Sequence, residues 1–292
     1  MSSAAAGSAS DDPIAIICGA GTLPFAVAES VMRRRRPVVL FALRGWTDPE
    51  RVRAYPHYWA AVGQFGWFCR MARTEGCREV VFIGSVARPR LWRMRPDATT
   101  LRLLPRVWRH YRGGDDYLLS GIGKIFEEHG FRLVGIPEIA PEILMPTGPL
   151  GRHRPSEQDE RDIEKGLLLL SAMSPFDVGQ AAVVADHRVL AIEAAEGTDR
   201  MLSRIARLRQ ERSIERGFGR GVLVKAAKRG QDRRLDLPSI GPQTIELAAK
   251  AGLAGIAVSA GSVILAEAQR LPQAADQARL FVVGMAEQAA EK

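Results

Sequence analysis

The chain has 292 residues, of which 46% are hydrophobic and 25% charged, a globular composition too long for one compact core, so two domains are expected. No run of about 18 apolar residues occurs, so no membrane-spanning helix is expected. The formal net charge of +8 favours anionic partners, which include nucleic acid, phosphorylated metabolites and acidic membrane surfaces.

Residues 1–12 are small and polar and lack the cationic and apolar regions of a signal peptide. They are predicted to form a disordered tail, and no export is expected. The three cysteines, Cys18, Cys69 and Cys77, form no C-x-x-C pair and lie in or beside apolar runs. An odd number of such thiols suits a reducing cytoplasm better than a disulfide framework.

Residues 14–43 predict a strand, a helix and a second strand, the opening of an α/β domain. The turn CGAGTLP follows the first strand and contains Gly19 and Gly21. Its backbone N–H groups could bind a phosphate or a sugar. A third glycine is absent and Pro24 interrupts the pattern, so the turn does not form a full dinucleotide fingerprint.

The alternation of helix and strand continues to about residue 136. Gly84 and Ser85 follow a predicted buried strand, at the edge where open α/β sheets bind ligands. Asp115 and Asp116 precede a predicted helix, which favours N-capping, with a ligand or metal role as the alternative.

Residues 146–161 concentrate proline, glycine and charge, as a linker does, and predict a domain boundary near Gly148. Domains are therefore predicted at residues 13–148 and 149–292. The second half predicts a helix, two strands joined by a turn at 186–188, and a polar turn at 196–199 before another helix. Further strands and a helix follow, which predicts a second α/β domain with a mixed sheet.

The segment KRGQDRRLDLPSIGPQT, residues 228–244, sets two carboxylates among four cations. A solvated loop is one interpretation. In either an extended or a helical geometry, however, Asp232 and Asp236 would form a compact acidic pair. Pro242 suits the first position of the next helix, whose N-terminus would favour an anion. Carboxylates, cations and a helix N-terminus together favour phosphoryl-group chemistry.

Several motifs in order resemble the LpxI-type UDP-2,3-diacylglucosamine pyrophosphatases of bacterial lipid A biosynthesis. The resemblance runs from Ile14 nearly to the C-terminus. The motifs are CGAGTLP, FIGSVARP, GDD before a helix, FDVGQAAVV, AIEAAEGTDRML, VLVKAAK, RLDLPSIGPQT and AGLAGIAVSAG.

The resemblance implies a cytoplasmic enzyme, peripherally associated with the inner membrane, that hydrolyses UDP-2,3-diacylglucosamine to UMP and 2,3-diacylglucosamine 1-phosphate. It implies a requirement for Mg²⁺, for which Mn²⁺ could substitute because hard oxygen ligands suit both ions. It also implies a homodimer whose subunits have two α/β domains with substrate held between them. The first domain is predicted to be Rossmann-like and the second to have a mixed sheet. The aspartate of the DLP motif, here Asp236, is implied to be catalytic.

A pyrophosphate is anionic, so its hydrolysis needs cations to neutralise charge and a group to position water. Asp236 is assigned to metal binding or water activation. The predicted metal ligands are Asp236, Glu196 and Asp232. The predicted substrate contacts are Gly19, Gly21, Gly84, Ser85, Gln180, Thr198, Lys225 and Lys228. For each residue alone, a cap or a surface polar group is the competing interpretation.

The main alternative is a nucleotide-sugar-binding regulatory protein or transferase that does not hydrolyse its ligand. A nucleic-acid-binding module is a second alternative, but the chain lacks zinc-finger spacing, an aromatic RNP-like strand and a recognisable helix-turn-helix, so no nucleic-acid partner is predicted. Residues 101–108, LRLLPRVW, favour an amphipathic helix packed on the first domain, with an acyl-chain neighbourhood as the other interpretation.

Overall fold

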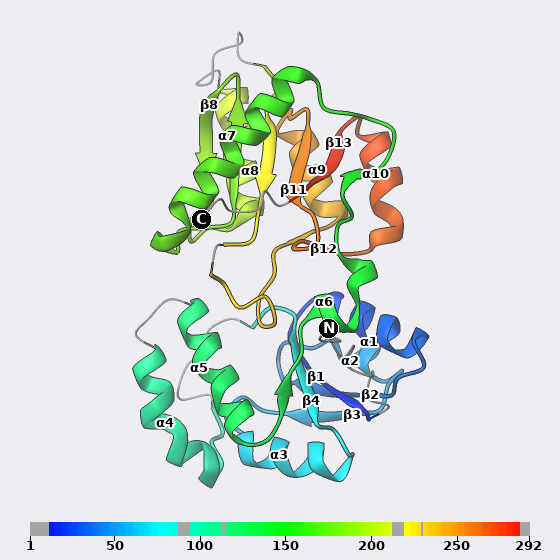
Figure 1. Ribbon diagram of the computed structural model, residues 1–292, viewed down its shortest axis with the longest axis vertical. Helices are drawn as coiled ribbons and strands as arrows, with labels where there is room; N and C mark the ends of the chain where they lie inside the picture. The colour runs from blue at the N-terminus through cyan, green and yellow to red at the C-terminus, as the bar shows by residue number, and fades with distance from the viewer. Residues whose placement is uncertain (1–11, 87–93, 112–114, 212–218, 229, 287–292) are drawn as a thin grey trace, which may run out of the picture. The chain divides into compact units, whose positions relative to one another are not determined.

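The chain forms two compact units, residues 1–135 and 136–292, each of which is an α/β fold (Figure 1). The computed structural model describes residues 12–86, 94–111, 115–211, 219–228 and 230–286. Except for Asp12, the predicted disordered tail lies outside the described residues. The domain boundary near Gly148 stays a prediction.

The first unit is built on a parallel five-stranded sheet of order β3-β2-β1-β4-β5. Its strands are β1 (Ile14–Cys18), β2 (Val38–Leu43), β3 (His57–Ala60), β4 (Glu79–Ile83) and β5 (Arg132–Leu133). Its helices are α1 (Leu23–Arg33), α2 (Pro49–Val52), α3 (Phe65–Thr74), α4 (Ala98–Tyr111) and α5 (Asp115–Glu128). The chain runs from β1 outward to β3 and then crosses to β4, so the strand order reverses between β1 and β4. Ligands of open α/β sheets bind at such a point.

The second unit contains a mixed six-stranded sheet of order β6-β13-β11-β9-β7-β8 and a parallel pair, β10 and β12. Its strands are β6 (Gly148–Pro149), β7 (Ala181–Ala185), β8 (Arg188–Ile192), β9 (Val222–Lys225), β10 (Ser239–Ile240), β11 (Gly255–Ser259), β12 (Ile264–Leu265) and β13 (Phe281–Met285). Its α-helices are α6 (Ile136–Ile139), α7 (Glu157–Met173), α8 (Thr198–Gln210), α9 (Pro242–Lys250) and α10 (Leu271–Gln277). Short 3₁₀ turns occupy Pro141–Ile143, Ser174–Phe176 and Ala268–Arg270.

The predicted fold class is confirmed in both units: the first sheet is parallel and the second mixed. Pro24 lies in the first turn of α1, where a missing N–H removes no helical hydrogen bond. Helix α9 begins at Pro242, as the sequence predicts, and Gly252 follows it with φ of +67°. Proline and glycine in the sequence therefore predict correctly where α9 begins and ends.

Helix α7 packs closely on the second sheet. Ser156 and Asp159 form a capping box at its N-terminus, and its buried side carries Ile163, Gly166 and Leu170 at helical spacing. A Cβ on Gly166 would lie only 2.5 Å from a methyl carbon of Val224 in β9. The missing side chain thus lets the helix approach the sheet.

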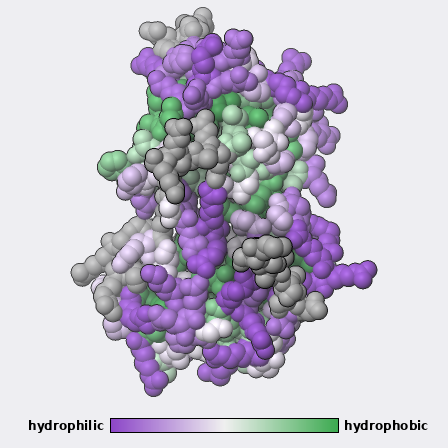
Figure 2. All heavy atoms as spheres, viewed as in Figure 1, coloured by the Kyte–Doolittle hydropathy of each residue, from purple (hydrophilic) through white to green (hydrophobic). Residues whose placement is uncertain are grey.

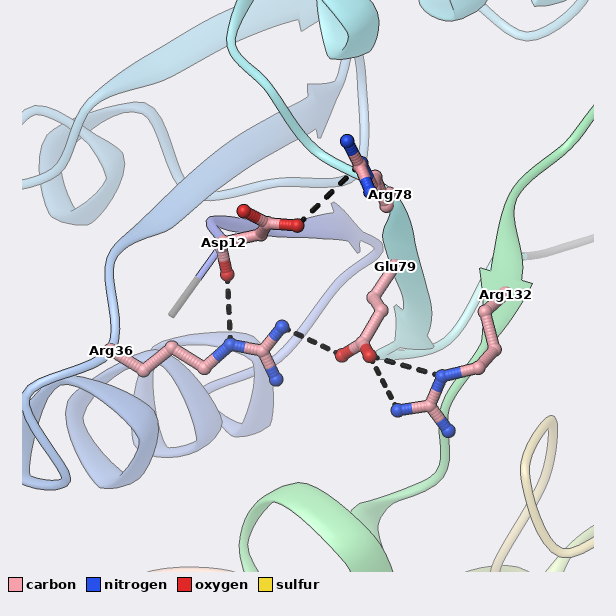
Figure 3. Close-up of polar contacts among 5 residues, drawn as sticks. All are labelled: Asp12, Arg36, Arg78, Glu79 and Arg132. Carbon is pink, nitrogen blue, oxygen red and sulfur yellow. Dashed lines mark hydrogen bonds and ion pairs between the residues drawn. The ribbon is translucent and has the colours of Figure 1, made fainter. Parts of the chain in front are cut away.

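The amino-terminal edge of the first sheet is held by a buried carboxylate, Glu79, which is 5% exposed (Figure 3). Its Oε2 lies 2.7 Å from Nη2 of Arg36, and its Oε1 accepts a hydrogen bond from Nε of Arg132 at 3.0 Å. Nε of Arg36 also donates to the backbone carbonyl of Asp12 at 2.9 Å, and Arg78 lies 3.6 Å from the Asp12 carboxylate. These arginines join strands at the edge opposite the glycine turns and stabilise the fold.

Hydrophilic side chains are spread over the face of both units seen in Figure 2. In the part of the chain that the structure describes, no helix combines the length and the apolar character needed to cross a membrane. The segment predicted to be amphipathic lies in α4, where Leu101 and Trp108 are 53% and 46% exposed.

Candidate active site

Polar side chains converge at one edge of the second sheet. Strand β9 is antiparallel to β7 and parallel to β11, and β7 is antiparallel to β8. The carboxyl ends of β8, β9 and β11 therefore meet the amino end of β7 at the same edge. Lys225 ends β9, Gln180 precedes β7, and Glu193 follows β8. Helix α8 begins at Thr198, shortly after β8 ends at this edge.

The centre of this edge is a chain of hydrogen bonds. Nζ of Lys225 donates to Oγ1 of Thr198 at 2.9 Å, and that hydroxyl donates to Oε1 of Glu193 at 3.0 Å. Oε2 of Glu193 accepts from the backbone N–H of Gln180 at 3.1 Å. Three residues predicted from sequence, Gln180, Thr198 and Lys225, are thus brought together, and Glu193 joins them.

Lys225 is a buried cation, 9% exposed. Burial lowers the pKa of its ammonium group, and the negative charges of Glu193, Asp199 and Asp236 oppose that shift. A lysine held in this way is a strong electrostatic partner for an anionic ligand, because water screens it poorly.

Asp236 lies in a turn in the segment between β9 and β10. Its backbone N–H donates to the carbonyl of Asp232 at 3.3 Å, and its Oδ2 accepts from the side-chain amide of Gln231 at 2.7 Å. The amide oxygen of Gln231 in turn accepts from the backbone N–H of Lys228 at 3.3 Å. Gln231 thus orients the predicted catalytic carboxylate, which is half-buried.

The other two predicted metal ligands are paired with arginines. Asp232 accepts hydrogen bonds from Nε and Nη2 of Arg234 at 3.0 and 2.7 Å, and this contact lowers the pKa of its carboxyl. A backbone hydrogen bond and Arg204, at 2.8 Å, lower the pKa of Glu196. Their assignment as metal ligands stays a prediction.

Lys228, a predicted phosphate ligand, forms an ion pair with Asp177. Asp177 caps the 3₁₀ turn before β7 in a left-handed conformation, with φ of +51°. A substrate phosphate that bound Lys228 would compete with this carboxylate.

In the first unit, the predicted glycine turns lie against each other at the point between β1 and β4. The backbones of Ala20 and Ser85 exchange hydrogen bonds of 2.8 and 3.2 Å. A Cβ on Gly19 would lie 2.7 Å from backbone atoms of Gly84 and Ser85, so glycine is needed for the two loops to pack. The substrate contacts predicted at Gly19, Gly84 and Ser85 stay predictions. Gly21 has a φ of +97°, close to that of Gly84, but apart from its chain neighbours no described atom lies within 4 Å of a Cβ placed there. This leaves room beside the turn.

Sequence reasoning missed Glu193, Asp199 and Asp177. Glu193 lies in the motif AIEAAEGTD, and its position directly after a predicted strand was the available signal. Oδ2 of Asp199 accepts from the side-chain amide of Gln243 at 3.0 Å, which links α8 to the first turn of α9. For Asp199 and Asp177, nothing in the local pattern distinguishes the side chain from an exposed carboxylate.

A closed metal site made by protein groups alone is not found among the described residues, since no three His, Cys, Asp or Glu side chains gather to form one. Mg²⁺, however, is often bound by one or two carboxylates together with substrate phosphates and water. Asp236, whose negative charge acts on Lys225, fits that arrangement.

Comparison with known proteins gives matches along most of the chain. The family model of the LpxI N-terminal domain matches residues 13–143, and that of the LpxI C-terminal domain matches residues 146–283. The UDP-2,3-diacylglucosamine pyrophosphatase LpxI of Caulobacter vibrioides is 40% identical over 278 residues, covering 93% of this chain and 97% of the relative.

Proposed function

The chain belongs to the LpxI family, and on this premise we propose that it hydrolyses the pyrophosphate bond of UDP-2,3-diacylglucosamine in lipid A biosynthesis. The products would be UMP and 2,3-diacylglucosamine 1-phosphate. The observation that carries the proposal is the 40% identity to the Caulobacter vibrioides pyrophosphatase across nearly all of both chains. Because both LpxI domains are matched, the likeness is not confined to a nucleotide-binding module.

The carboxyl edge of the second sheet has the groups that this reaction requires. Hydrolysis of a pyrophosphate places negative charge on phosphate oxygens, which the ammonium of Lys225 would neutralise. Asp236 would orient or deprotonate the attacking water, and Gln231 holds its carboxylate in place. Lys228 would add a second cation once substrate displaces Asp177.

We propose that Mg²⁺ is required and that Asp236 binds it together with phosphate oxygens of the substrate. When bound, the ion would neutralise charge on the pyrophosphate. Asp232 and Glu196 are the further ligands predicted from sequence. Arg234 contacts both oxygens of Asp232, and Arg204 contacts Oε1 of Glu196, so the ion would compete with these arginines. Mn²⁺ has the same preference for oxygen ligands and is expected to substitute.

The turn at Gly21 is proposed to contact the nucleotide or the sugar. Its backbone follows a parallel strand at the point where the strand order reverses, and the space beside it suits a ligand. Ser85 lies in the neighbouring loop and would contact the same part of the substrate.

Peripheral contact with the inner membrane from the cytoplasm is proposed because the substrate carries two acyl chains. Exposed Leu101 and Trp108 on α4, with exposed Arg102 between them, are groups that favour an anionic lipid surface. Co-sedimentation with anionic vesicles tests this contact. The homodimer implied by the family resemblance is tested by light scattering of the purified protein.

The central experiment incubates the purified protein with UDP-2,3-diacylglucosamine and measures UMP. We expect release of UMP with Mg²⁺ or Mn²⁺, loss of activity with excess chelator, and recovery when the metal returns. Full turnover in excess EDTA contradicts the metal requirement. Tight binding of the lipid nucleotide without any UMP would instead indicate a non-hydrolytic binding protein.

A second comparison tests the lipid end of the substrate. UDP-N-acetylglucosamine has the same pyrophosphate but lacks the long chains. Because each buried methylene contributes about 0.8 kcal/mol, kcat/KM is expected to favour the diacyl substrate by several orders of magnitude. Equal efficiency on both would indicate a general UDP-sugar hydrolase.

A further inference from the structure

Glu193 makes two hydrogen bonds that determine how Thr198 is oriented. An ionised carboxylate only accepts hydrogen bonds, so the Thr198 hydroxyl must donate its single proton to Oε1 of Glu193. The oxygen of that hydroxyl is then left to accept from Nζ of Lys225. The polarity of the whole chain of hydrogen bonds therefore follows from the charge of Glu193.

The geometry at Glu193 is rigid because backbone holds it on both sides. Its N–H donates to the carbonyl of Ala181 at 2.8 Å, and its Oε2 accepts from the N–H of Gln180. A Cβ on Gly179 would lie 2.2 Å from the Glu193 carbonyl oxygen, so only glycine permits this approach. Gly179 in the motif FDVGQ and Glu193 in the motif AIEAAEGTD thus pack directly against each other.

Lys225 is bound to Glu193 through Thr198, and this contact uses only part of its capacity to donate hydrogen bonds. An ammonium group has three N–H donors, and within the described part of the chain the structure assigns one of them, to Thr198. Both Lys225 and Thr198 are 9% exposed, so few orientations are open to either side chain. The remaining donors suit a phosphate oxygen.

We propose that Glu193 is a positioning residue: through Thr198 it aims the ammonium group of Lys225 at the phosphate oxygens of the substrate. The proposal rests on the proposed function, because it assigns Lys225 to the pyrophosphate. Glu193 itself touches no reacting atom. Its contribution is the orientation of a cation that stabilises developing charge.

Kinetics of three variants test the proposal: Glu193→Gln, Thr198→Val and the double variant. Glu193→Gln can satisfy the Gln180 N–H with its amide oxygen, but then it turns an N–H₂ donor toward Thr198. We expect each single variant to lower kcat about 10- to 100-fold with KM changed less than about threefold. The double variant should be no slower than the slower single variant, because both break the same chain of hydrogen bonds.

Two controls separate positioning from folding. Glu246→Gln removes an exposed carboxylate on α9, which pairs with Lys250, and should leave kcat unchanged. Thr198→Ser keeps the hydroxyl and should restore most of the activity that Thr198→Val loses. If Glu193→Gln does not fold, the pair Thr198→Val and Thr198→Ser decides, since equal kcat values for these two would overturn the proposal.

The pH profile provides a readout that a purely structural role would not change. The described charges that act on Lys225 are Glu193, Asp199 and Asp236, and each raises its pKa. Without the Glu193 charge, the fall of kcat/KM on the basic side should move to lower pH. An unmoved basic limb, a wild-type kcat in Glu193→Gln, or additive effects in the double variant would overturn the positioning role. Absence of UMP from the wild-type protein would instead contradict the proposed function.

Discussion

The carboxyl edges of the two sheets are formed by different kinds of groups, backbone atoms in the first unit and side chains in the second. At the first sheet, loops meet through backbone atoms: Gly19 and Gly84 have no room for a side chain, and their neighbours exchange backbone hydrogen bonds. At the second sheet, side chains meet, and the buried cation Lys225 is oriented by Thr198 and Glu193. The carboxyl edge of the sheet is thus closely packed backbone in the first unit and a group of charged and polar side chains in the second.

This difference predicts where substitutions act. Changes at the first edge should reduce stability, because they displace backbone that cannot move independently. Changes at the second edge should reduce activity with less effect on folding, because its charges contribute little apolar burial. All five tryptophans, Trp46, Trp59, Trp67, Trp92 and Trp108, belong to the first unit, so tryptophan fluorescence reports unfolding of that unit alone.

The largest effect is expected at Asp236. Asp236→Ala removes the carboxylate assigned to water or metal and should lower kcat by about 10²- to 10⁴-fold. The folded structure and lipid-nucleotide binding should be retained, because the side chain lies in a half-buried turn. Release of UMP measures the loss of activity, circular dichroism measures the fold, and equilibrium binding of the lipid nucleotide measures the retained affinity.

Asp236→Asn is the matched variant, since it keeps the size and the contact with Gln231 while removing the charge. It should be nearly as slow as Asp236→Ala. If either variant kept most of the activity, the carboxylate would not be the catalytic group.

The contrast between the edges also explains what could be predicted from the sequence. Apolar runs such as IAIIC in β1 predict buried strands directly, and glycine and proline mark the helix ends. Local patterns also placed Lys225 and Thr198 near strand ends. Glu193 was missed because its role depends on the pairing of β7 with both β8 and β9, which is a property of the sheet and not of the local sequence.

An intermediate effect is expected at the glycine turns of the first unit. Gly84 has φ of +94°, and a Cβ there would lie 2.6 Å from the carbonyl oxygen of Ala20. Gly84→Ala should therefore destabilise the first unit by about 3 kcal/mol, from strain and collision together. Gly21→Ala has a similar φ but open space, so about 1–2 kcal/mol is expected from strain alone.

Urea unfolding followed by tryptophan fluorescence compares the two glycine variants. Equal midpoints for Gly84→Ala and Gly21→Ala would show that the loops can separate, and that the close approach does not hold this edge together.

The smallest effect is expected at Asp97, whose carboxylate caps helix N-termini at the carboxyl edge of the first sheet. Its oxygens accept from the backbone N–H groups of Trp67 and Thr100, both at 2.8 Å, and so join the amino ends of α3 and α4. Burial by itself would raise the pKa of Asp97, but these hydrogen bonds outweigh it and lower the pKa. Asp97→Asn should cost about 1–2 kcal/mol at neutral pH, because an amide cannot accept at both positions.

The sign of the pH dependence follows from the lowered pKa of Asp97. Its stabilisation is complete above the pKa of an unfolded aspartate, about 3.9, and is lost as the pH falls from there through the folded pKa. The difference in urea midpoint between wild type and Asp97→Asn should therefore be constant from pH 7 to about 5 and shrink below about pH 4. A difference that stayed constant to pH 3, or grew, would mean that the charge of Asp97 does not stabilise the helix ends and that backbone packing alone holds this edge.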